Sequence, residues 1–402
     1  MRKQLLVILL VAMVMVLGCA DSGDLSADEQ QPPEQDVIVV DRATKICQLV
    51  GEYDRERDEL TINRTQSRYN LLGADMGTPF QHNGRTYLVF GDTVGPPVGD
   101  AIAYTTDTTP EDGIELVFIH DETGTYKPVQ IPGISQEGYE VPMEGTSVGG
   151  RMYIYHTTDS TGKDKMGRSV VAVSDDNGHT FTYLYDLSTQ HFINVSIVEV
   201  DLADWSGFPQ NRGTGLVMFG SGSYRRSNVR LAFQPAEDIE SRTSIRYFAG
   251  LDHLGQPIWS AQEEEAQPLF NQPCIGELSV SYNHFIDKWI MLYNCSAISI
   301  AWRGINMRTA DQPWGPWSEH QIIFHPWDDN GYCHFMHANW ESRKCDNIHD
   351  PGRENEWGGE YAPYQFEDLA VGDDSTTTIY FTMSTWNPYT AVLMKATLQK
   401  IR

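Results

Sequence analysis

The chain has 402 residues, 40% of them hydrophobic, which is enough for one large domain or two ordinary ones with a buried core. Asp and Glu total 55 against 29 Lys and Arg. The resulting net charge of −26 argues against a nucleic-acid partner, because phosphate binding needs clustered cations. The 10 Trp and 19 Tyr, with 34 Gly and 20 Pro, favour many short strands joined by tight turns over a helical bundle.

Residues 1–19 are predicted to be an export signal. Arg2 and Lys3 precede an uncharged run over residues 5–17, which is too short to span a bilayer as a free helix and fits a secretory signal. The run ends in V-L-G-C, which resembles the bacterial lipobox, where cleavage precedes a cysteine that becomes lipidated. An uncleaved anchor is the alternative, and the small residues before Cys19 disfavour it. We therefore expect an exported bacterial lipoprotein of the cell envelope, held at the outer membrane or cell surface by a lipid on Cys19.

Residues 20–43 are predicted to form a disordered tether. The stretch ADSGDLSADEQQPPEQD over residues 20–36 contains almost no apolar side chains, so it cannot bury a core of its own. No later run is long and apolar enough to cross a membrane. The folded domain is therefore expected to occupy residues 44–402.

A strand-turn-strand unit recurs five times along this domain. The clearest strand of each unit is an aromatic and β-branched run that ends in a small polar residue. Aligned positions in these runs are 66, 64, 73 and 90 residues apart, and regular strand clusters at such periods indicate propeller blades. We therefore predict an all-β fold, a five-bladed β-propeller of four-stranded blades, closed by residues 44–50 pairing with the last blade. The five runs are residues 86–93, 152–158, 215–221, 289–296 and 379–385.

In each unit, a candidate inner strand carries a polar residue near its start. Because the innermost strands of a propeller line its central channel, we expect these side chains to gather around one axis. They are Asp75, Glu144, Asn194, Glu277 and Glu360.

The segment S-D-D-N-G-H-T-F over residues 174–181 resembles the Asp-box found at blade hairpins of sialidase-like propellers. There the Asp and Gly organise a tight turn and perform no chemistry. A sialidase would also need an arginine cluster for the substrate carboxylate, which cannot be assembled convincingly from this sequence. The motif is therefore predicted to be structural.

Two aspartates of the first unit are predicted to form a catalytic pair. Asn83-Gly84 between two apolar runs indicates a two-residue hairpin, which places Asp75 directly opposite Asp92. Opposed side chains have Cβ atoms about 4.5–5.5 Å apart, so the two acids should share a raised apparent pKa. Carboxyl groups about 5–5.5 Å apart suit retaining glycoside hydrolysis, with one nucleophile and one acid/base. A bulge near Pro79 would break this register. Alternatively, both acids cap turns or bind a cation at the blade end.

Further polar and aromatic residues are predicted to bind a glycan. A loop at residues 284–287 would place Glu277 opposite Asn294, a carboxylate beside an amide that suits sugar hydroxyls. The Gly-Gly turn at residues 149–150 would place Glu144 opposite Tyr155, with His156 nearby. Such a polar, aromatic funnel suits carbohydrate. The predicted substrate-binding residues are Glu144, His156, Asn194, Glu277, Asn294, Glu360, Tyr361 and Trp386.

The cysteines favour disulfides over a metal site. Residues 324–358 hold four histidines and two cysteines that a zinc site would use, but no C-x-x-C or H-E-x-x-H spacing is present. In an oxidising compartment we expect a loop closed by Cys333 and Cys345 instead. Cys274 and Cys295 flank the fourth hairpin and form the second predicted pair, which leaves Cys47 free. We expect no metal and no cofactor. A structural cation in the channel is the one alternative that the sequence does not exclude.

The first unit carries the most specific family resemblance. The pattern G-A-D-x-G, then N-G-R-x-Y-x-x-F-G-D-T, then E-G-T and finally Y-A-P-Y resembles a bacterial domain family formerly of unknown function. Some members are endo-D-arabinofuranases, also called endo-D-arabinanases, which are retaining hydrolases on a five-bladed propeller. The resemblance spans nearly the whole mature chain and implies that Asp75 and Asp92 are the catalytic pair. Insertions at residues 261–267 and 324–358 depart from the family pattern, and loops over the channel set substrate choice.

These observations predict a surface-anchored, retaining glycoside hydrolase that acts on a furanoside polysaccharide such as a D-arabinan. We expect a monomer that contacts the membrane only through its lipid and binds no nucleic acid. The alternative is a non-catalytic glycan-binding or scaffold propeller. The two hypotheses differ in what they predict for Asp75 and Asp92: the hydrolase requires both residues to lie together at the floor of an open channel.

Overall fold

The computed structural model describes residues 35–162, 166–222, 225–295, 303–339 and 345–401. The described residues from Gln35 onward belong to one compact unit. The predicted signal peptide, the lipobox Cys19 and residues 20–34 of the predicted tether lie outside the described residues. Within the described ranges, no helix has the length and apolar character needed to cross a membrane.

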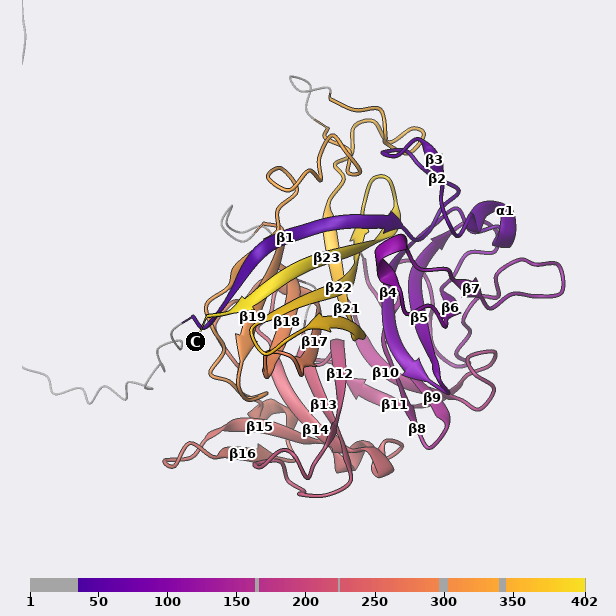
Figure 1. The fold of residues 1–402 in the computed structure, drawn as a ribbon. Coiled ribbons are helices and arrows are strands. Elements are labelled where there is room, and N and C mark those ends of the chain that lie inside the picture. The colour runs from indigo at the N-terminus through magenta and orange to yellow at the C-terminus, as the bar shows by residue number, and fades with distance from the viewer. Residues whose placement is uncertain (1–34, 163–165, 223–224, 296–302, 340–344, 402) are drawn as a thin grey trace, which may run out of the picture. The chain divides into compact units, whose positions relative to one another are not determined.

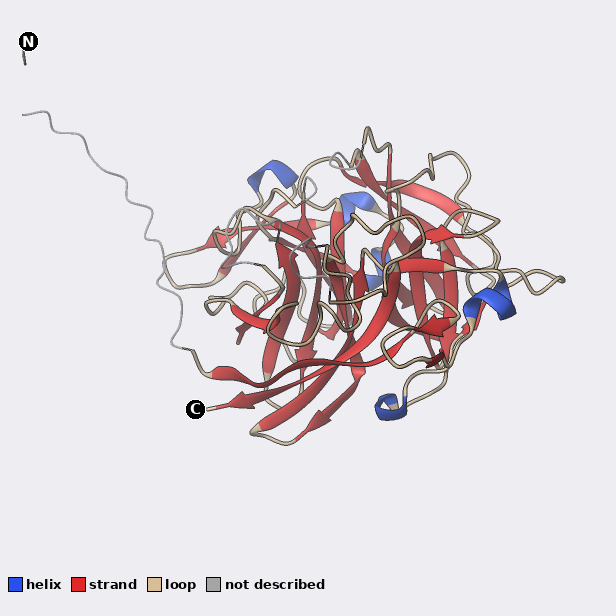
Figure 2. Ribbon diagram, turned by 90° about the horizontal axis from the view of Figure 1, so that it is seen from above, coloured by secondary structure: helices blue, strands red, loops and turns tan. Residues whose placement is uncertain are grey.

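The compact unit is an all-β, five-bladed β-propeller built from five antiparallel sheets (Figures 1 and 2). The first blade is β4 (Gly73–His82), β5 (Arg85–Val94), β6 (Ala101–Thr105) and β7 (Val117–Phe118). The second is β8 (Pro142–Val148), β9 (Arg151–Thr158), β10 (Arg168–Ser174) and β11 (Thr182–Ser188). The third is β12 (Asn194–Asp201), β13 (Thr214–Ser221), β14 (Arg230–Pro235), β15 (Arg246–Leu251) and β16 (Pro257–Ser260). The fourth is β17 (Ile275–Asn283), β18 (Lys288–Cys295), β19 (Ile305–Ala310) and β20 (Gln321–Phe324). The fifth is β21 (Glu360–Gly372), β22 (Thr376–Thr385), β23 (Thr390–Lys400) and β1 (Val37–Gln48).

Helices contribute little to the described structure (Figure 2). A small hairpin of β2 (Tyr53–Asp54) and β3 (Glu59–Leu60) precedes the short helix α1 (Thr65–Tyr69). The 3₁₀ turns are Pro110–Asp112, Ala236–Asp238, Arg242–Ser244 and Glu263–Glu265.

The inner strands form a closed ring around the channel. Consecutive inner strands contact one another in the order β4, β8, β12, β17, β21 and back to β4. The second strand of each blade supplies much of the core between blades, with the side chains of Phe90, Tyr155, Phe219, Trp289 and Phe381 fully buried. Each such burial contributes about 1.5–3 kcal/mol, which offsets the entropy of ordering the many short strands. The five predicted runs lie in these second strands, except for residue 296, which lies outside the described residues.

The ring closes as expected, but the domain begins earlier than residue 44. Strand β1 pairs with β23 from Val37 to Gln48 and lies beside it in Figure 1. The predicted tether boundary is therefore wrong for residues 37–43. The apolar run that starts at Val37 offers strand-forming side chains, and Val37 itself is fully buried in the core. Just before it, Asp36 forms an ion pair with the buried Lys288 of β18.

Two further details of the blades can be compared with the sequence expectations. The third blade has five strands rather than four, because the β15–β16 hairpin extends its outer edge. The Asp-box turn joins β10 to β11, where the Asp176 carboxylate accepts the Thr180 backbone N–H at 2.8 Å and its hydroxyl at 2.7 Å. The predicted structural role of this motif is confirmed.

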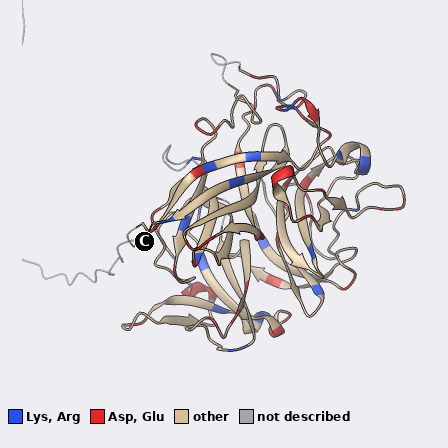
Figure 3. Cartoon of the chain, viewed as in Figure 1, with Lys and Arg blue, Asp and Glu red and all other residues tan. Residues whose placement is uncertain are grey.

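Both predicted disulfides are present. Cys274–Cys295 links the segment before β17 to the end of β18, and Cys333–Cys345 closes a loop between β20 and β21. The Cys47 thiol is free and buried in β1. In Figure 3 the Lys and Arg positions of the described residues are scattered over many elements and are not gathered on one of them.

Candidate active site

A cavity of about 610 Å³ lies where the inner strands β4, β17 and β21 begin. Its volume is within the range of small-ligand sites, about 300–1,000 Å³. Asp75 and Asp92 both line it, so the two aspartates share one cavity. The other lining residues are Met76, Tyr139, Val141, Met166, Arg225, Glu277, Asn355, Glu356, Trp357, Gly359, Glu360, Tyr361 and Trp386.

The two aspartates are not directly opposed, so the predicted register is wrong at this point. From Thr78 to His82 the hairpin has the expected pairing, but beyond the bulge at Gly77 it slips by one residue and Asp75 pairs with Gly91. Both Met76 and Gly77 have left-handed backbones, with φ of 66° and 76°. A slip of one residue alone would turn Asp92 to the other face of the strand. Because Asp92 also has a left-handed backbone, with φ of 43°, its side chain returns to the same cavity as Asp75.

Asp75 is deeply buried and carries the more strongly raised pKa of the two acids. Burial, followed by the charge of Asp92, raises the pKa of Asp75 to about 8, against the opposing effect of the Tyr361 and Tyr389 hydroxyls. The Tyr361 hydroxyl donates to Asp75 Oδ2 at 2.9 Å. Gly91 makes room for this carboxyl, because a Cβ at residue 91 would stand 2.9 Å from Asp75 Oδ1.

Asp92 lies in a more polar environment. Both of its carboxylate oxygens lie 3.0 Å from the Tyr139 backbone nitrogen, which donates to them. Burial raises the pKa of Asp92 to about 6, and the Tyr139 N–H is the main opposing influence. The Asp92 backbone N–H donates to Asp100 Oδ1 at 3.2 Å, and Asp100 Oδ2 lies 2.8 Å from His156 Nε2. His156 is fully buried behind Asp92, so it supports this carboxylate and does not line the cavity.

A third carboxylate, Glu277, is held in its ionised form by Arg225. Burial would raise the pKa of Glu277, but the Arg225 guanidinium brings it below its ordinary value. Two Arg225 nitrogens each donate to a Glu277 oxygen at 3.2 Å, and the guanidinium lies over the Tyr361 ring at 5.4 Å. Asn294 Nδ2 donates to the same carboxylate at 2.8 Å. The expected contact between Glu277 and Asn294 is present, although a register shift lies at this point of the hairpin. Asn294 is buried and holds Glu277 from behind.

The last blade supplies another acid and two aromatic rings. Glu360 accepts the Gly304 backbone N–H at 2.8 Å, and burial raises its pKa above the ordinary range. Tyr361 is buried against Asp75, whereas Trp386 exposes 39% of its surface at the cavity. The expected polar and aromatic lining is present here.

Two of the predicted channel residues lie elsewhere. Glu144 is paired with Tyr155 as expected, but it lines a second cavity of about 510 Å³ that reaches the β4–β5 turn at the opposite end of the inner strands. Burial raises the pKa of Glu144 to about 8. Asn194 is fully buried and lines neither cavity, since its amide contacts Ser221 Oγ at 3.3 Å and the Gly222 carbonyl at 3.4 Å. A place near the start of an inner strand thus does not by itself fix the depth of a side chain in the channel.

Sequence reasoning missed several residues of the cavity, because they come from loops that carry no motif. Tyr139 precedes β8, Arg225 follows β13, and Glu356 and Trp357 belong to the long segment before β21. Tyr389 lies in the β22–β23 hairpin, two residues before the buried Ala391. The Arg225 contact with Glu277 depends on the ring arrangement of the blades, for which no local sequence signal exists.

Within the described ranges, the side chains of Cys333, Cys345 and Asp346 bring three possible metal-ligand atoms close together. The two sulfur atoms of this group form the disulfide, which leaves a single carboxylate. The acids of the cavity are not brought together in such a group among the described residues.

Comparisons with known proteins give a family for this chain and solved structures to which it is similar. No curated protein matches the chain in sequence. A GH43_1 enzyme from Xanthomonas citri is similar in structure, with 11% identity and a TM-score of 0.43 over 81% of this chain and 88% of that one. The native arabinanase of Bacillus subtilis has 10% identity and a TM-score of 0.43 over 81% and 96%. The catalytic domain of the Coprinopsis cinerea GH62 alpha-L-arabinofuranosidase has 11% identity and a TM-score of 0.44 over 89% and 97%. The model of DUF4185, a domain of unknown function, matches residues 61–395, and the chain therefore belongs to this family.

Proposed function

We propose that this protein is a retaining glycoside hydrolase in which Asp75 and Asp92 are the catalytic pair. The observation that carries the proposal is that two carboxyl groups with pKa values raised to different extents, about 8 and about 6, line one cavity. Pairs of acids whose environments separate their pKa values are the usual arrangement for acid and nucleophile roles. At neutral pH, Asp75 then carries a proton and Asp92 is largely ionised.

The protonation states assign the two roles. Asp92 attacks the anomeric carbon of the bound sugar while Asp75 gives its proton to the glycosidic oxygen, so the bond to the leaving sugar breaks. This step leaves the sugar covalently bound to Asp92. Asp75, now ionised, takes a proton from a water molecule that attacks the same carbon, which releases the sugar and restores both carboxyl groups. Two successive displacements retain the anomeric configuration.

Neighbouring residues support these roles. Glu277, kept ionised by Arg225, adds negative charge near Asp75 and so helps to hold the Asp75 proton. The Tyr139 backbone N–H, which lies between both Asp92 oxygens, stabilises the ionised form that attacks the sugar. Different neighbouring residues therefore influence the protonation of Asp75 and of Asp92.

We further propose that the substrate is a furanoside polysaccharide such as a D-arabinan. The motif G-A-D-x-G followed by F-G-D-T, which holds both aspartates, supports this choice through its resemblance to endo-D-arabinofuranases. The lipobox at Cys19 supports a location at the outside of the cell envelope, where such a polysaccharide is accessible. The two disulfides are also typical of an exported protein.

The test is a reducing-end assay of the purified protein against a panel of polysaccharides that includes D-arabinan. We expect cleavage with retained anomeric configuration, measured by NMR of the first product. Asp75→Asn and Asp92→Asn should each lower turnover by on the order of 10²–10⁴ without loss of the fold. The matched control is Glu144→Gln, which changes an acid of the opposite cavity and should leave turnover near the wild-type value. Wild-type turnover in both Asp variants would refute the pair, and glycan binding without any cleavage would favour the non-catalytic alternative.

A further inference from the structure

The segment between β20 and β21 forms one wall of the active-site cavity. Three of its residues, Asn355, Glu356 and Trp357, line the cavity together with the catalytic pair. Earlier in this segment, the Cys333–Cys345 disulfide closes a loop.

Two indole rings, Trp357 of this wall and Trp386 of the β22–β23 hairpin, are exposed to the cavity. Trp357 exposes 36% of its surface and Trp386 exposes 39%. Large aromatic side chains are usually buried, so two half-exposed indoles in one cavity are available to a ligand. The face of an indole carries partial negative charge and attracts the weakly positive C–H bonds of a sugar ring. A cavity wall without aromatic rings does not offer this attraction to a sugar ring.

Both indoles are held in fixed orientations. The Trp386 Nε1–H donates to a Glu356 carboxylate oxygen at 2.9 Å, and the Arg353 guanidinium lies 4.7 Å from the ring centre of Trp386. Arg353 also donates to that oxygen at 2.8 and 3.0 Å. Trp357 packs edge-on against the ring of Tyr332 at 5.2 Å. The rings are thus oriented before any ligand binds, which reduces the entropy lost on binding.

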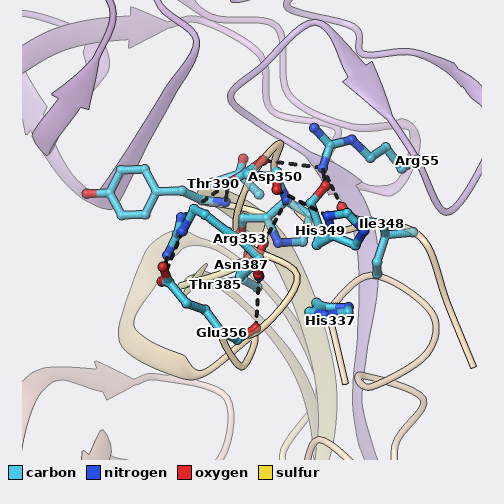
Figure 4. Close-up of polar contacts among 12 residues, drawn as sticks. Arg55, His337, Ile348, His349, Asp350, Arg353, Glu356, Thr385, Asn387 and Thr390 are labelled. Atoms are coloured by element: carbon cyan, nitrogen blue, oxygen red, sulfur yellow. Dashed lines mark hydrogen bonds and ion pairs between the residues drawn. The ribbon is translucent and has the colours of Figure 1, made fainter. Parts of the chain in front are cut away.

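The wall is anchored to the β22–β23 hairpin through Asn387, which is fully buried (Figure 4). The Asn387 amide donates to the carbonyl groups of Arg353 and Glu356, each at 2.9 Å, and its Oδ1 accepts the Asp350 backbone N–H at 2.8 Å. One side chain therefore connects three points of the wall to the hairpin that carries Trp386.

A second anchor connects the wall to the catalytic acid. Asp350 Oδ2 accepts the Tyr389 backbone N–H at 2.8 Å, and the Tyr389 side chain lies beside Asp75. From the other side, Arg55 of the segment between β2 and β3 donates to the His349 carbonyl at 2.7 Å and to Asp350 Oδ1 at 3.2 Å (Figure 4). The position of the wall relative to Asp75 is thus set by contacts from two other parts of the chain, the β22–β23 hairpin and the segment between β2 and β3.

From this arrangement we propose that Trp357 and Trp386 form an additional sugar-binding subsite, which makes the protein selective for longer glycan chains. The subsite takes a ring of the glycan beyond the two that share the cleaved bond, and Asn387 is the positioning residue that holds it. The proposal rests on the proposed hydrolase function. It assigns specificity to residues of the wall and of the β22–β23 hairpin, whereas the proposed chemistry belongs to the first blade.

The test uses a ladder of D-arabinan oligosaccharides, beginning with the shortest one that the wild-type protein cleaves. For the wild-type protein, kcat/KM should rise with chain length. For Trp386→Ala and Trp357→Ala, it should fall on the order of 10–100-fold on the longest oligosaccharide, mainly through KM, and change little on the shortest. Trp386→Phe should restore part of the length dependence because it keeps a ring.

Asn387→Asp tests the anchor, because it keeps the Oδ1 acceptor and removes the amide donor. We expect the same selective loss on long oligosaccharides with both indoles still present.

Tyr53→Ala, which removes an exposed aromatic side chain outside this cavity, is the control and should behave as wild type. If both Trp→Ala variants keep the wild-type dependence on chain length, the subsite is refuted while the hydrolase function stands. If the wild-type protein cleaves no oligosaccharide of the ladder, the hydrolase function on this substrate fails, and the subsite fails with it.

Discussion

The chemical difference between Asp75 and Asp92 arises from their surroundings. Both are aspartates of one hairpin, but Asp75 is 7% exposed and accepts a tyrosine hydroxyl, whereas Asp92 accepts a backbone N–H with both oxygens. Burial raises both pKa values, and it does so further for Asp75, which also has the charges of Asp92 and Glu277 nearby. Environment alone therefore separates the proposed proton donor from the proposed nucleophile.

This separation predicts a bell-shaped pH dependence of kcat/KM. Activity should rise as Asp92 loses its proton near pH 6 and fall as Asp75 loses its proton near pH 8, so the maximum should lie between these values. The Tyr361 hydroxyl lowers the pKa of Asp75, because a donated hydrogen bond favours the carboxylate. Tyr361→Phe should therefore move the alkaline limb to higher pH and leave the acid limb in place. A pH–rate profile of both proteins measures this, and an unchanged alkaline limb would contradict the assignment of Asp75 as the acid.

At the scale of the element, the first hairpin is the part of the fold that places the proposed catalytic pair. Its turn and lower half follow the register that Asn83-Gly84 imposes, and the bulge at Gly77 changes the register only near the cavity. Bulges near active sites re-aim side chains at the cost of local pairing. The hairpin thus combines a regular half that packs in the blade with an irregular half that carries Asp75 and Asp92.

Gly77→Ala tests this division, with Gly84→Ala as its matched control. Both glycines have φ near 75°, so alanine strains the backbone at each position by about 1–2 kcal/mol. A Cβ at residue 77 would also lie 3.1 Å from Phe90 Cε1 and 3.3 Å from Thr382 Cγ2, whereas a Cβ at residue 84 meets nothing within 4 Å. Thermal unfolding should show a larger loss for Gly77→Ala, and turnover should fall only in that variant. Equal melting temperatures and equal turnover in the two variants would show that the bulge does not position the aspartates.

At the scale of the whole molecule, five blades around one channel bring together side chains from distant parts of the chain. The cavity joins Asp75 of the first blade to Glu277 of the fourth and Trp386 of the fifth. Strand β1 closes the ring on β23, and the pairing fixes both ends of the folded unit. The channel exists only when all the blades are in place.

The same scale includes the proposed attachment to the membrane through Cys19. Cys19→Ser removes the thiol that would carry the lipid, so the protein should no longer fractionate with membranes or be cleaved before residue 19. The measurement is fractionation of cells followed by mass spectrometry of the N-terminus. Cys47→Ser is the matched control, since that buried thiol lies within the fold and should not affect fractionation. Unchanged cleavage and membrane association in Cys19→Ser would refute the lipoprotein proposal.

Local patterns in the sequence were sufficient to predict the blades and both disulfides, and they singled out two aspartates that line one cavity. These features depend on strand periodicity, on turn residues and on cysteines that flank one hairpin or one loop, all of which are short-range. The start of the domain at Val37 was missed because an apolar run beside an acidic stretch does not show its partner, β23.

Only the tertiary structure decided how the site is assembled. The bulge at Gly77, where the register slips, lies against the side chains of Phe90 and Thr382, which come from distant parts of the chain. The Arg225–Glu277 pair, the position of Glu144 in the opposite cavity and the Asn387 anchor depend on which blades and loops face one another. The sequence by itself thus determined the elements and the chemical groups, whereas their depth, partners and protonation were decided by packing, because burial and long-range contacts exist only in the closed ring.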